Sequence, residues 1–193
     1  MKKILFIILI LFLSIKNSYA ENNVKRIYEG NEGSKITILV YESLTCSHCA
    51  TFHSDIYPNL KKNFIDKGYV KIEYRNFPLD LAAFNAAKAA HCKSNNGEEI
   101  LHYLYKHQSD WVKGNTIDDL NKNLESLLKS QNFGINYNEC INNKNIEDFV
   151  LEDRIEGVKK YNVSATPTLI INGEKFEKPL SYKNLEKTLE KLL

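Results

Sequence analysis

The sequence carries little net charge of either sign. Its 193 residues contain 26 lysines and arginines against 24 aspartates and glutamates, a formal balance of +2. Lys2, Lys3 and Lys16 lie in the first 20 residues, which hold no acidic residue, so the remaining 23 basic and 24 acidic residues leave −1. Proteins that bind nucleic acid electrostatically need a basic surface. We therefore expect no nucleic-acid partner.

Long hydrophobic runs are missing after residue 20, so no later segment is expected to span a membrane. Within the first 20 residues, two lysines precede the apolar run 4–15, and a small-residue site follows at 18–20. About a dozen apolar residues are fewer than the roughly 17 that a spanning helix needs. This arrangement is typical of a secretory signal peptide over residues 1–20, with an uncleaved membrane anchor as the alternative. The exported chain would begin at Glu21.

Cysteine is scarce. The four cysteines are too few to staple a miniprotein, so the hydrophobic core must provide most of the stability. Cys46 and Cys49 sit three positions apart, whereas Cys92 and Cys140 lie far downstream. An even number in an exported chain suits two disulfides. The uneven spacing predicts different roles for the two pairs.

Apolar periodicity predicts the secondary structure. Strands are expected at 36–41, 70–75, 168–171 and near 175–176, and helices at 46–65, 81–90, 98–111, 116–134, 145–160 and 181–192. Pro58 should kink or end the first helix, and Asn172-Gly173 signals a hairpin turn. The first strand, helix and strand form a βαβ unit. The simplest architecture is one α/β domain, residues 21–80 and 162–193, split by an all-helical insertion at 81–161.

The sharpest motif is Cys46-Ser47-His48-Cys49, placed where a buried strand turns into a helix. Amide groups in the first turn of a helix are unpaired and carry the positive end of its dipole, so they stabilise a thiolate at Cys46. A protonated His48 would add to this effect. Stabilising the thiolate favours the reduced dithiol and makes the disulfide a stronger oxidant. Cys49, one turn further on, is placed to be the buried resolving thiol.

The same spacing also serves as half of a zinc site. A complete site needs two more ligands, and His48 and His53 are the nearest donors. His48 lies inside the loop, and the βαβ setting favours a redox motif. We therefore expect no metal. His53, one turn beyond Cys49, is expected on the helix surface or partly packed, and the alternative is that it lines the site. His91, His102 and His107 are expected to be structural.

Taken together, these segments resemble the DsbA-like thiol:disulfide oxidoreductases of the thioredoxin superfamily. The resemblance rests on TCSHCATFH at 45–53, YRNFPLDLAA at 74–83, the helical insertion after it, and VSATPTLIING at 163–173. It implies a thioredoxin fold with an inserted helical domain. It also implies that Cys46 attacks substrate, that Cys49 resolves the mixed disulfide, and that Ser47 and His48 tune the potential.

The resemblance further implies a cis-proline loop facing the motif, at Thr166-Pro167. A cis peptide exposes the backbone of the preceding residue, so Thr166 can pair with an extended substrate as an added strand. The alternative is an ordinary trans proline at the start of a strand. Threonine at this position occurs in family branches with different redox directions, so it does not decide between oxidase and isomerase.

One departure from the family concerns a buried acid. Many members carry it six positions before the first cysteine, where this sequence has Val40, whereas Glu42 lies four before Cys46. Glu42 should point to the face of the strand opposite Tyr41. It is either a proton acceptor for Cys49 or a solvated carboxylate at the end of the strand.

Cys92 and Cys140 lie in the helical insertion, and a bridge between them would close a loop worth roughly 4 kcal/mol in the chain-entropy model. We expect a structural disulfide. The alternative is a second redox pair that tunes Cys46 and Cys49 from a distance.

The leading hypothesis is a monomeric enzyme that donates the Cys46–Cys49 disulfide to reduced, unfolded exported proteins in the periplasm, without a cofactor. The resemblance implies reoxidation by a quinone-linked membrane oxidase of the DsbB type. A disulfide isomerase or a dedicated thiol reductase is the alternative, although the short N-terminal segment leaves no room for an isomerase's dimerisation module. From another class, a metallochaperone or binding protein would use Cys46 and Cys49 as metal ligands.

Overall fold

A computed structural model describes residues 24–193 apart from 94 and 96. The predicted signal peptide lies outside the described residues. Five strands form one sheet in the order β1-β3-β2-β4-β5. The strands are β1 (Ile27–Glu29), β2 (Ile36–Glu42), β3 (Val70–Asn76), β4 (Thr168–Ile171) and β5 (Glu174–Lys175). The central strands β2 and β3 are parallel, with Ile36 opposite Val70 and Glu42 opposite Asn76. The predicted βαβ unit is therefore present.

The outer strands pair antiparallel with their neighbours. β4 lies against β2, and β5 returns from β4 through the predicted Asn172-Gly173 turn, where both residues have positive φ. These are the angles that a two-residue hairpin turn requires. On the opposite side, β1 pairs with β3. The sequence did not indicate β1, because three residues are too few to show an alternating pattern.

The segment after the cysteine motif stays helical from residue 47 to 65. It comprises α2 (Ser47–Thr51), η2 (Phe52–Ile56), α3 (Tyr57–Leu60) and η3 (Lys61–Ile65), of which η2 and η3 are π-helical. Pro58 lies in the first turn of α3, directly after the π-helical turn. A wider turn at this point accommodates a residue that lacks an amide hydrogen. The predicted kink or end of the first helical part at Pro58 thus coincides with a change of helix type, from η2 to α3.

Helices fill the chain between β3 and β4. They are α4 (Leu81–Ala90), α5 (Gly97–Lys106), α6 (Gln108–Trp111), α7 (Ile117–Gln131), α8 (Tyr137–Ile141) and α9 (Lys144–Tyr161). Asp80, Thr116 and Asn143 cap their helices with side-chain hydrogen bonds. The predicted helix at 98–111 is two helices, α5 and α6. The five-residue α8 was not predicted.

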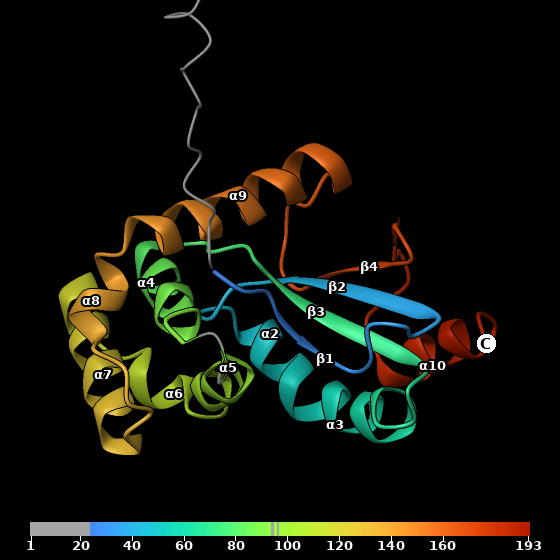
Figure 1. The fold of residues 1–193 in the computed structure, drawn as a ribbon, viewed down its shortest axis with the longest axis horizontal. Coiled ribbons are helices and arrows are strands. Elements are labelled where there is room, and N and C mark those ends of the chain that lie inside the picture. The colour runs from blue at the N-terminus through green and yellow to red at the C-terminus, as the bar shows by residue number, and fades with distance from the viewer. Residues whose placement is uncertain (1–23, 94, 96) are drawn as a thin grey trace, which may run out of the picture.

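Helices cover both faces of the sheet. In Figure 1, α9 runs along one face, whereas α2, α3 and the C-terminal α10 (Tyr182–Glu190) lie on the other, with α4–α8 gathered at one end. One large apolar cluster continues from the sheet into α4, α5 and α7. A smaller cluster, formed by Tyr41, Phe77, Val163 and Ile170, lies on the face of the sheet beneath α9. The inserted helices and the sheet therefore share a hydrophobic core.

A buried ionic cluster fastens α9 to the sheet. The carboxylate of Asp153 is fully buried and bonds to Arg26, to Arg75 and to the backbone and side-chain amides of Asn76. A buried carboxylate persists only when charges and hydrogen-bond donors surround it. This cluster fixes the position of α9 relative to β3.

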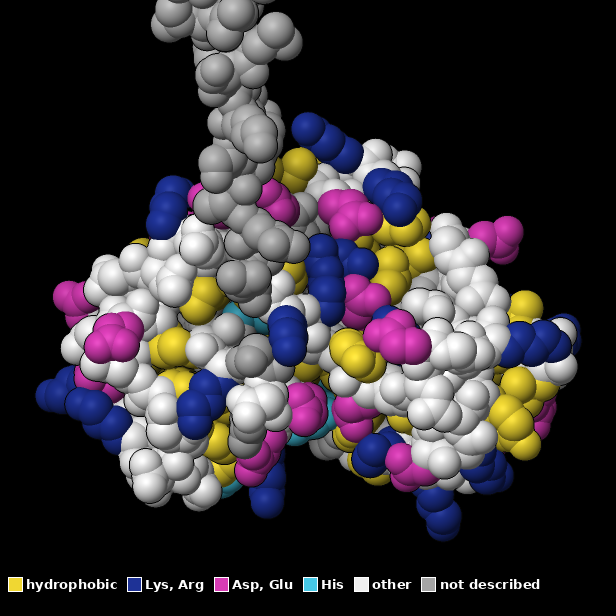
Figure 2. Space-filling model, in the orientation of Figure 1, with side chains coloured by type: hydrophobic (Ala, Val, Ile, Leu, Met, Phe, Trp, Pro, Cys, Tyr) yellow, Lys and Arg dark blue, Asp and Glu magenta, His cyan; other side chains and the backbone are white. Residues whose placement is uncertain are grey.

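The visible surface mixes charges of both signs, as the small net charge predicts (Figure 2). Lysine and arginine side chains alternate with aspartate and glutamate over most of this face. Within the described part of the chain, none of the helices has the length and apolar character needed to cross a bilayer.

Candidate functional site

The two motif cysteines differ in exposure because of their places on the helix. Cys46 is the N-cap residue of α2, in extended conformation, and is partly exposed, whereas Cys49 is fully buried. The carbonyl of Cys46 accepts hydrogen bonds from the amides of Cys49 and Ala50, and also from the side chain of Gln108 at 3.0 Å. Gln108 on α6, which braces the loop, was not indicated by any sequence motif. Both cysteines are free thiols in the structure.

A proline loop faces Cys46. The Thr166–Pro167 peptide is cis, and the Cys46 Sγ donates a hydrogen bond to the Thr166 carbonyl at 3.3 Å. The expected juxtaposition of this loop with the cysteine motif is therefore present. A groove of about 230 Å³ runs beside it, lined by His48, Thr51, Phe52, Ile56, Thr166, Pro167 and Leu180. Ser47 and His48 are exposed at its rim.

Burial controls the chemistry of Cys49. Removal from water raises the pKa of its thiol well above the usual value, and the negative charge of Glu42 raises it further. A thiolate at Cys49 is therefore costly, because it would lie in an apolar setting beside an anionic carboxylate. Any reaction that uses this sulfur must also move a proton.

Glu42 is buried, with 5% of its surface exposed, so the alternative of a solvated carboxylate is wrong. Its side chain lies on the face of β2 opposite Tyr41, which packs against α9. One carboxylate oxygen, Oε2, bonds to His53 Nε2 at 2.8 Å, whereas Oε1 is buried without a hydrogen-bond partner. The strand thus carries an acid into the protein interior, below the cysteine motif.

His53 is also buried, which differs from the expected helix-surface or partly packed position and agrees with the alternative that it lines the site. Its ring stacks on Tyr105 at 4.0 Å, and its Nδ1 lies 3.2 Å from the Nδ1 of His102 on α5. The Nε2 of His102 in turn bonds to Glu29 at 2.8 Å. The structure therefore joins four titratable side chains from β2, η2, α5 and β1 in one hydrogen-bonded row.

Glu29 ends the row as an anion. Burial works to raise the pKa of this carboxyl, but hydrogen bonds from His102, Tyr57 and Tyr74 and the charge of His102 outweigh burial and lower the pKa to about 2. Lys61 adds an ion pair at 3.1 Å. Glu29 therefore stays charged at any physiological pH.

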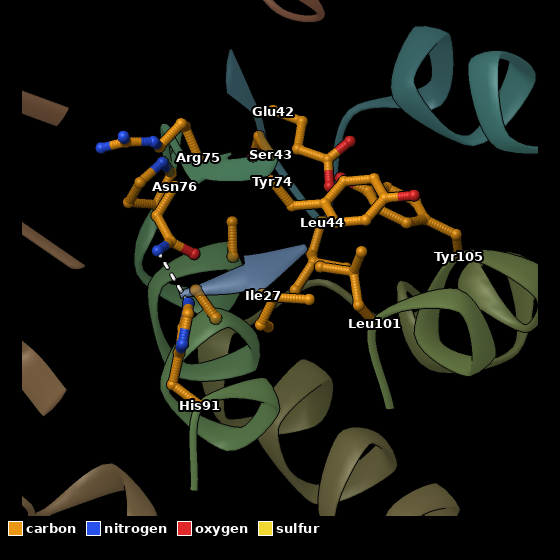
Figure 3. Close-up of a pocket in the computed structure, with 13 residues that line it drawn as sticks. Ile27, Glu42, Ser43, Leu44, Tyr74, Arg75, Asn76, His91, Leu101 and Tyr105 are labelled. Atoms are coloured by element: carbon orange, nitrogen blue, oxygen red, sulfur yellow. Dashed lines mark hydrogen bonds between the residues drawn. The ribbon is translucent and has the colours of Figure 1, made fainter. Parts of the chain in front are cut away.

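A small internal cavity of about 10 Å³ lies behind the site (Figure 3). Figure 3 shows Glu42 and Tyr105 at one end of the cavity, and the hydrogen-bonded pair Asn76 and His91 at the other. This volume is close to the minimum for a single water molecule. The cavity is too small to hold a substrate or an organic cofactor.

The second pair of cysteines lies apart from these groups. Cys92, which follows α4, forms a disulfide with Cys140 on α8, and their Cα atoms are 5.3 Å apart. This bond links two elements of the helical insertion. Over residues 24–193, leaving aside 94 and 96, three or more His, Cys, Asp or Glu side chains are nowhere grouped so as to hold a metal ion.

Comparison with known proteins points to one family. The model of the thioredoxin family described as Thioredoxin_4 matches residues 22–191. The crystal structure of alpha-DsbA1 from Wolbachia pipientis superposes with a TM-score of 0.78 at 27% identity, over 87% of this chain and 90% of that one. BdbD from Bacillus subtilis has the same fold, with a TM-score of 0.67 at 24% identity, over 86% and 92% of the two chains.

Sequence relatives agree with this result. Disulfide bond formation protein D of Bacillus subtilis is 25% identical over 173 residues, which are 85% of this chain and 75% of that protein. A Rickettsia prowazekii protein, provisionally named a protein-disulfide oxidoreductase, is 28% identical over 85% of this chain. The match spans only 60% of that protein's length. The expected thioredoxin fold with a helical insertion is confirmed, and the chain belongs to the thioredoxin family, among its DsbA-like members.

Proposed function

We propose that this protein is an exported thiol:disulfide oxidoreductase that donates a Cys46–Cys49 disulfide to reduced, unfolded proteins. The observation that carries the proposal is the pairing of a partly exposed Cys46 with a fully buried Cys49, beside the cis Thr166–Pro167 peptide. Only Cys46 can be reached by a substrate thiol. Its DsbA-like relatives support the same chemistry.

In the proposed reaction, a substrate thiolate attacks Cys46 Sγ of the oxidised protein, and Cys49 Sγ leaves with the electron pair and takes up a proton. A second substrate thiolate then attacks the substrate sulfur of the mixed disulfide, and Cys46 leaves as a thiolate. The substrate gains a disulfide, and Cys46 and Cys49 are left reduced. No cofactor is needed for this exchange.

The groove beside the proline loop is proposed to hold the substrate. An extended peptide can pair with the backbone at Thr166, as an added strand does, while its side chains lie on Phe52, Ile56 and Leu180. His48 at the rim contributes to the potential. Main-chain pairing places few demands on side chains, which suits a protein that must accept many unfolded clients.

Return of the reduced protein to the disulfide form requires an electron acceptor. We propose a quinone-linked membrane oxidase of the DsbB type, in keeping with the resemblance of this chain to exported DsbA-like proteins. Such a partner would meet Cys46 from the same groove, because this cysteine is the exposed sulfur of the pair. The Cys92–Cys140 disulfide is proposed to be structural.

The redox potential tests the direction of transfer. Equilibration with glutathione should give a redox potential of about −120 mV for an oxidase, whereas a potential of about −270 mV would assign the protein to the reductants. A reduced peptide with two cysteines should be oxidised by the wild type and not by Cys46→Ala. Retained oxidation by Cys46→Ala would contradict its role as the attacked sulfur. Tight binding of Cu(I) without peptide oxidation would favour the metal-binding alternative.

A further inference from the structure

The row Glu42, His53, His102 and Glu29 contains a fixed number of protons. Three contacts join the four side chains, at 2.8, 3.2 and 2.8 Å, and each hydrogen bond holds one proton between its two heavy atoms. The row therefore holds three protons. Because Glu29 is ionised above pH about 2, the proton of the outer contact belongs to His102 Nε2.

The other two protons can be placed in three ways. His102 can be doubly protonated and donate to His53, which then donates to Glu42. His53 can instead be doubly protonated, donating from Nδ1 to His102 and from Nε2 to Glu42. In the third arrangement, Glu42 is a carboxylic acid that donates to a neutral His53. One excess proton thus moves between Glu42 and His102 by short transfers within existing hydrogen bonds.

The two ends of this movement lie in different surroundings. At the inner end, Oε1 of Glu42 is buried and has no hydrogen-bond partner. The Cys49 sulfur lies within hydrogen-bond reach of the backbone of Ser43, the residue next to Glu42, and the charge of the Glu42 carboxylate acts on the Cys49 thiol. At the outer end, the His102 side chain is 25% exposed and borders a solvent-open pocket of about 540 Å³. His53 and Lys106 also line this pocket. Only the outer end meets water.

The neighbouring groups leave this path undisturbed. The titratable groups that face it from the surrounding elements are Cys49, Tyr57, Lys61, Tyr74, Tyr105 and Lys106. Burial raises the pKa of each of the three tyrosines, so they remain neutral. Lys61 is a permanent cation bound to Glu29. The stacked rings of Tyr105 on His53 and of Tyr57 on His102 hold both imidazoles in place.

We propose that Glu42, His53 and His102 form a proton relay between the buried Cys49 and the pocket beside His102. This inference rests on the proposed exchange reaction at Cys46 and Cys49 and deepens it. Glu42 is the group that exchanges a proton with the reacting thiol, and His53 and His102 are positioning residues that pass the proton on.

Each direction of the reaction uses the relay once. When a substrate thiolate breaks the Cys46–Cys49 bond, the Cys49 sulfur leaves as a thiolate and takes the proton of Glu42, and water reloads the row at His102. When Cys49 attacks a mixed disulfide on Cys46, its proton passes to Glu42 and an equivalent proton leaves from His102. The new sulfur bond forms as the substrate thiolate departs with the electron pair.

A mixed disulfide of Cys46 with 2-nitro-5-thiobenzoate isolates the second direction. Attack by Cys49 releases the coloured thiolate, which stopped-flow absorbance follows directly. Since a positioned proton acceptor contributes about 10²–10⁴-fold, we expect Glu42→Gln, His53→Gln and His102→Ala each to slow release by about tenfold or more at neutral pH. The loss should diminish as the pH rises and Cys49 ionises without help. The control variant is His107→Gln, whose partly exposed side chain pairs with Asp110 outside the row.

Rescue separates a relay from a structural role. His102→Ala enlarges the solvent-open pocket, so added imidazole should enter and restore release as its concentration rises, without affecting the wild type. Wild-type release rates and pH profiles in the His53 and His102 variants would overturn the relay, as would a slow His102→Ala protein that imidazole does not restore. If the wild type itself releases no thiolate, the proposed exchange reaction fails instead.

Discussion

His91 shows how a single buried side chain is held in one protonation state. Its Nε2 accepts a hydrogen bond from the side-chain amide of Asn76, and its Nδ1 lies 3.1 Å from the carbonyl of Lys25. An amide donor on one nitrogen and a carbonyl acceptor on the other fit the neutral ring with its proton on Nδ1. Burial lowers the pKa of His91 to about 4, with the charge of Asp153 opposing it only in part. Protonation would break the contact with Asn76.

The free energy of unfolding should therefore fall on acidification. The fall occurs in the pH range where His91 binds a proton in the unfolded chain but not in the folded protein. The unfolded side chain titrates near 6.5 and the folded one near 4, so the loss begins below pH about 6.5 and levels off below about 4. Between pH about 7 and about 5, we expect a loss of about 2 kcal/mol from this group. Urea unfolding of wild type and His91→Gln measures it. The variant should lose less over this range, whereas equal slopes would contradict the assignment.

The site residues differ in how far the sequence revealed them. Whereas the proline loop was expected from the resemblance to the DsbA-like family, the expectations for Cys46 and Cys49 came from motif and spacing, which are local signals. His53 had such a signal too, since it follows Cys49 by four residues and residues four apart share a face of a helix. A buried Cys49 should therefore have indicated a buried His53, a signal that the expected surface or partly packed position did not use. His102 had none, because its neighbour His53 lies 49 positions away in the sequence and only the fold brings them together.

At the scale of elements, the contact of α9 with the sheet depends on a glycine. A Cβ atom at Gly157 would lie 2.7 Å from the ring of Tyr41, which is fully buried on β2. The ring is held between Phe77 and Tyr161. Neither the helix nor the tyrosine can yield without disturbing the neighbouring contacts. Glycine at position 157 allows α9 and the ring of Tyr41 to approach closely, despite the low preference of glycine for helices.

Replacing Gly157 by alanine should thus destabilise the protein. Alanine favours a helix by about 1 kcal/mol over glycine, but overpacking a core contact costs about 1–3 kcal/mol. We expect a net loss of about 1 kcal/mol, measured as a lower midpoint of urea unfolding at an unchanged slope. The matched control is Glu152→Ala on the exposed side of α9, which should stay near the wild type. A more stable Gly157→Ala protein would show that the contact is loose.

Elements with a strong local pattern were predictable, and short ones were not. Helix α4 begins and ends where its cap and alanine-rich composition place it, and Ser181 caps α10 as expected. By contrast, β1 and α8 have three and five residues, too few for a periodic signal. At Pro58, where a kink or an end of the first helical part was predicted, a new α-helical segment follows the π-helical turn, and local rules do not foresee this change of helix type.

At the scale of the whole molecule, the Cys92–Cys140 disulfide spans 48 positions and encloses α5–α7. A loop of this length loses much of its freedom in the unfolded chain when its ends are joined. The enclosed helices also carry His102 and Gln108, which contact the site. The bond therefore favours the folded arrangement of the elements that complete the site.

Removing this disulfide should lower thermal stability without abolishing thiol exchange. The chain-entropy model assigns it about 4 kcal/mol, and at about 2–4 °C per kcal/mol for a chain of this size the midpoint should fall by roughly 10 °C. Calorimetry of Cys92→Ala/Cys140→Ala without reductant tests this, with release of 2-nitro-5-thiobenzoate as the functional readout. An unchanged midpoint would exclude a structural role. A changed redox potential at Cys46 would favour the alternative of a tuning pair.

The sheet ends on both sides in very short strands, three residues in β1 and two in β5. Long, flat sheet edges recruit extended chains, and natural proteins avoid this by keeping edge strands short. A protein that meets unfolded clients encounters such chains continually. Under the proposed function, the short border strands of the described sheet offer such chains little backbone to pair with, so that clients do not remain attached as added edge strands.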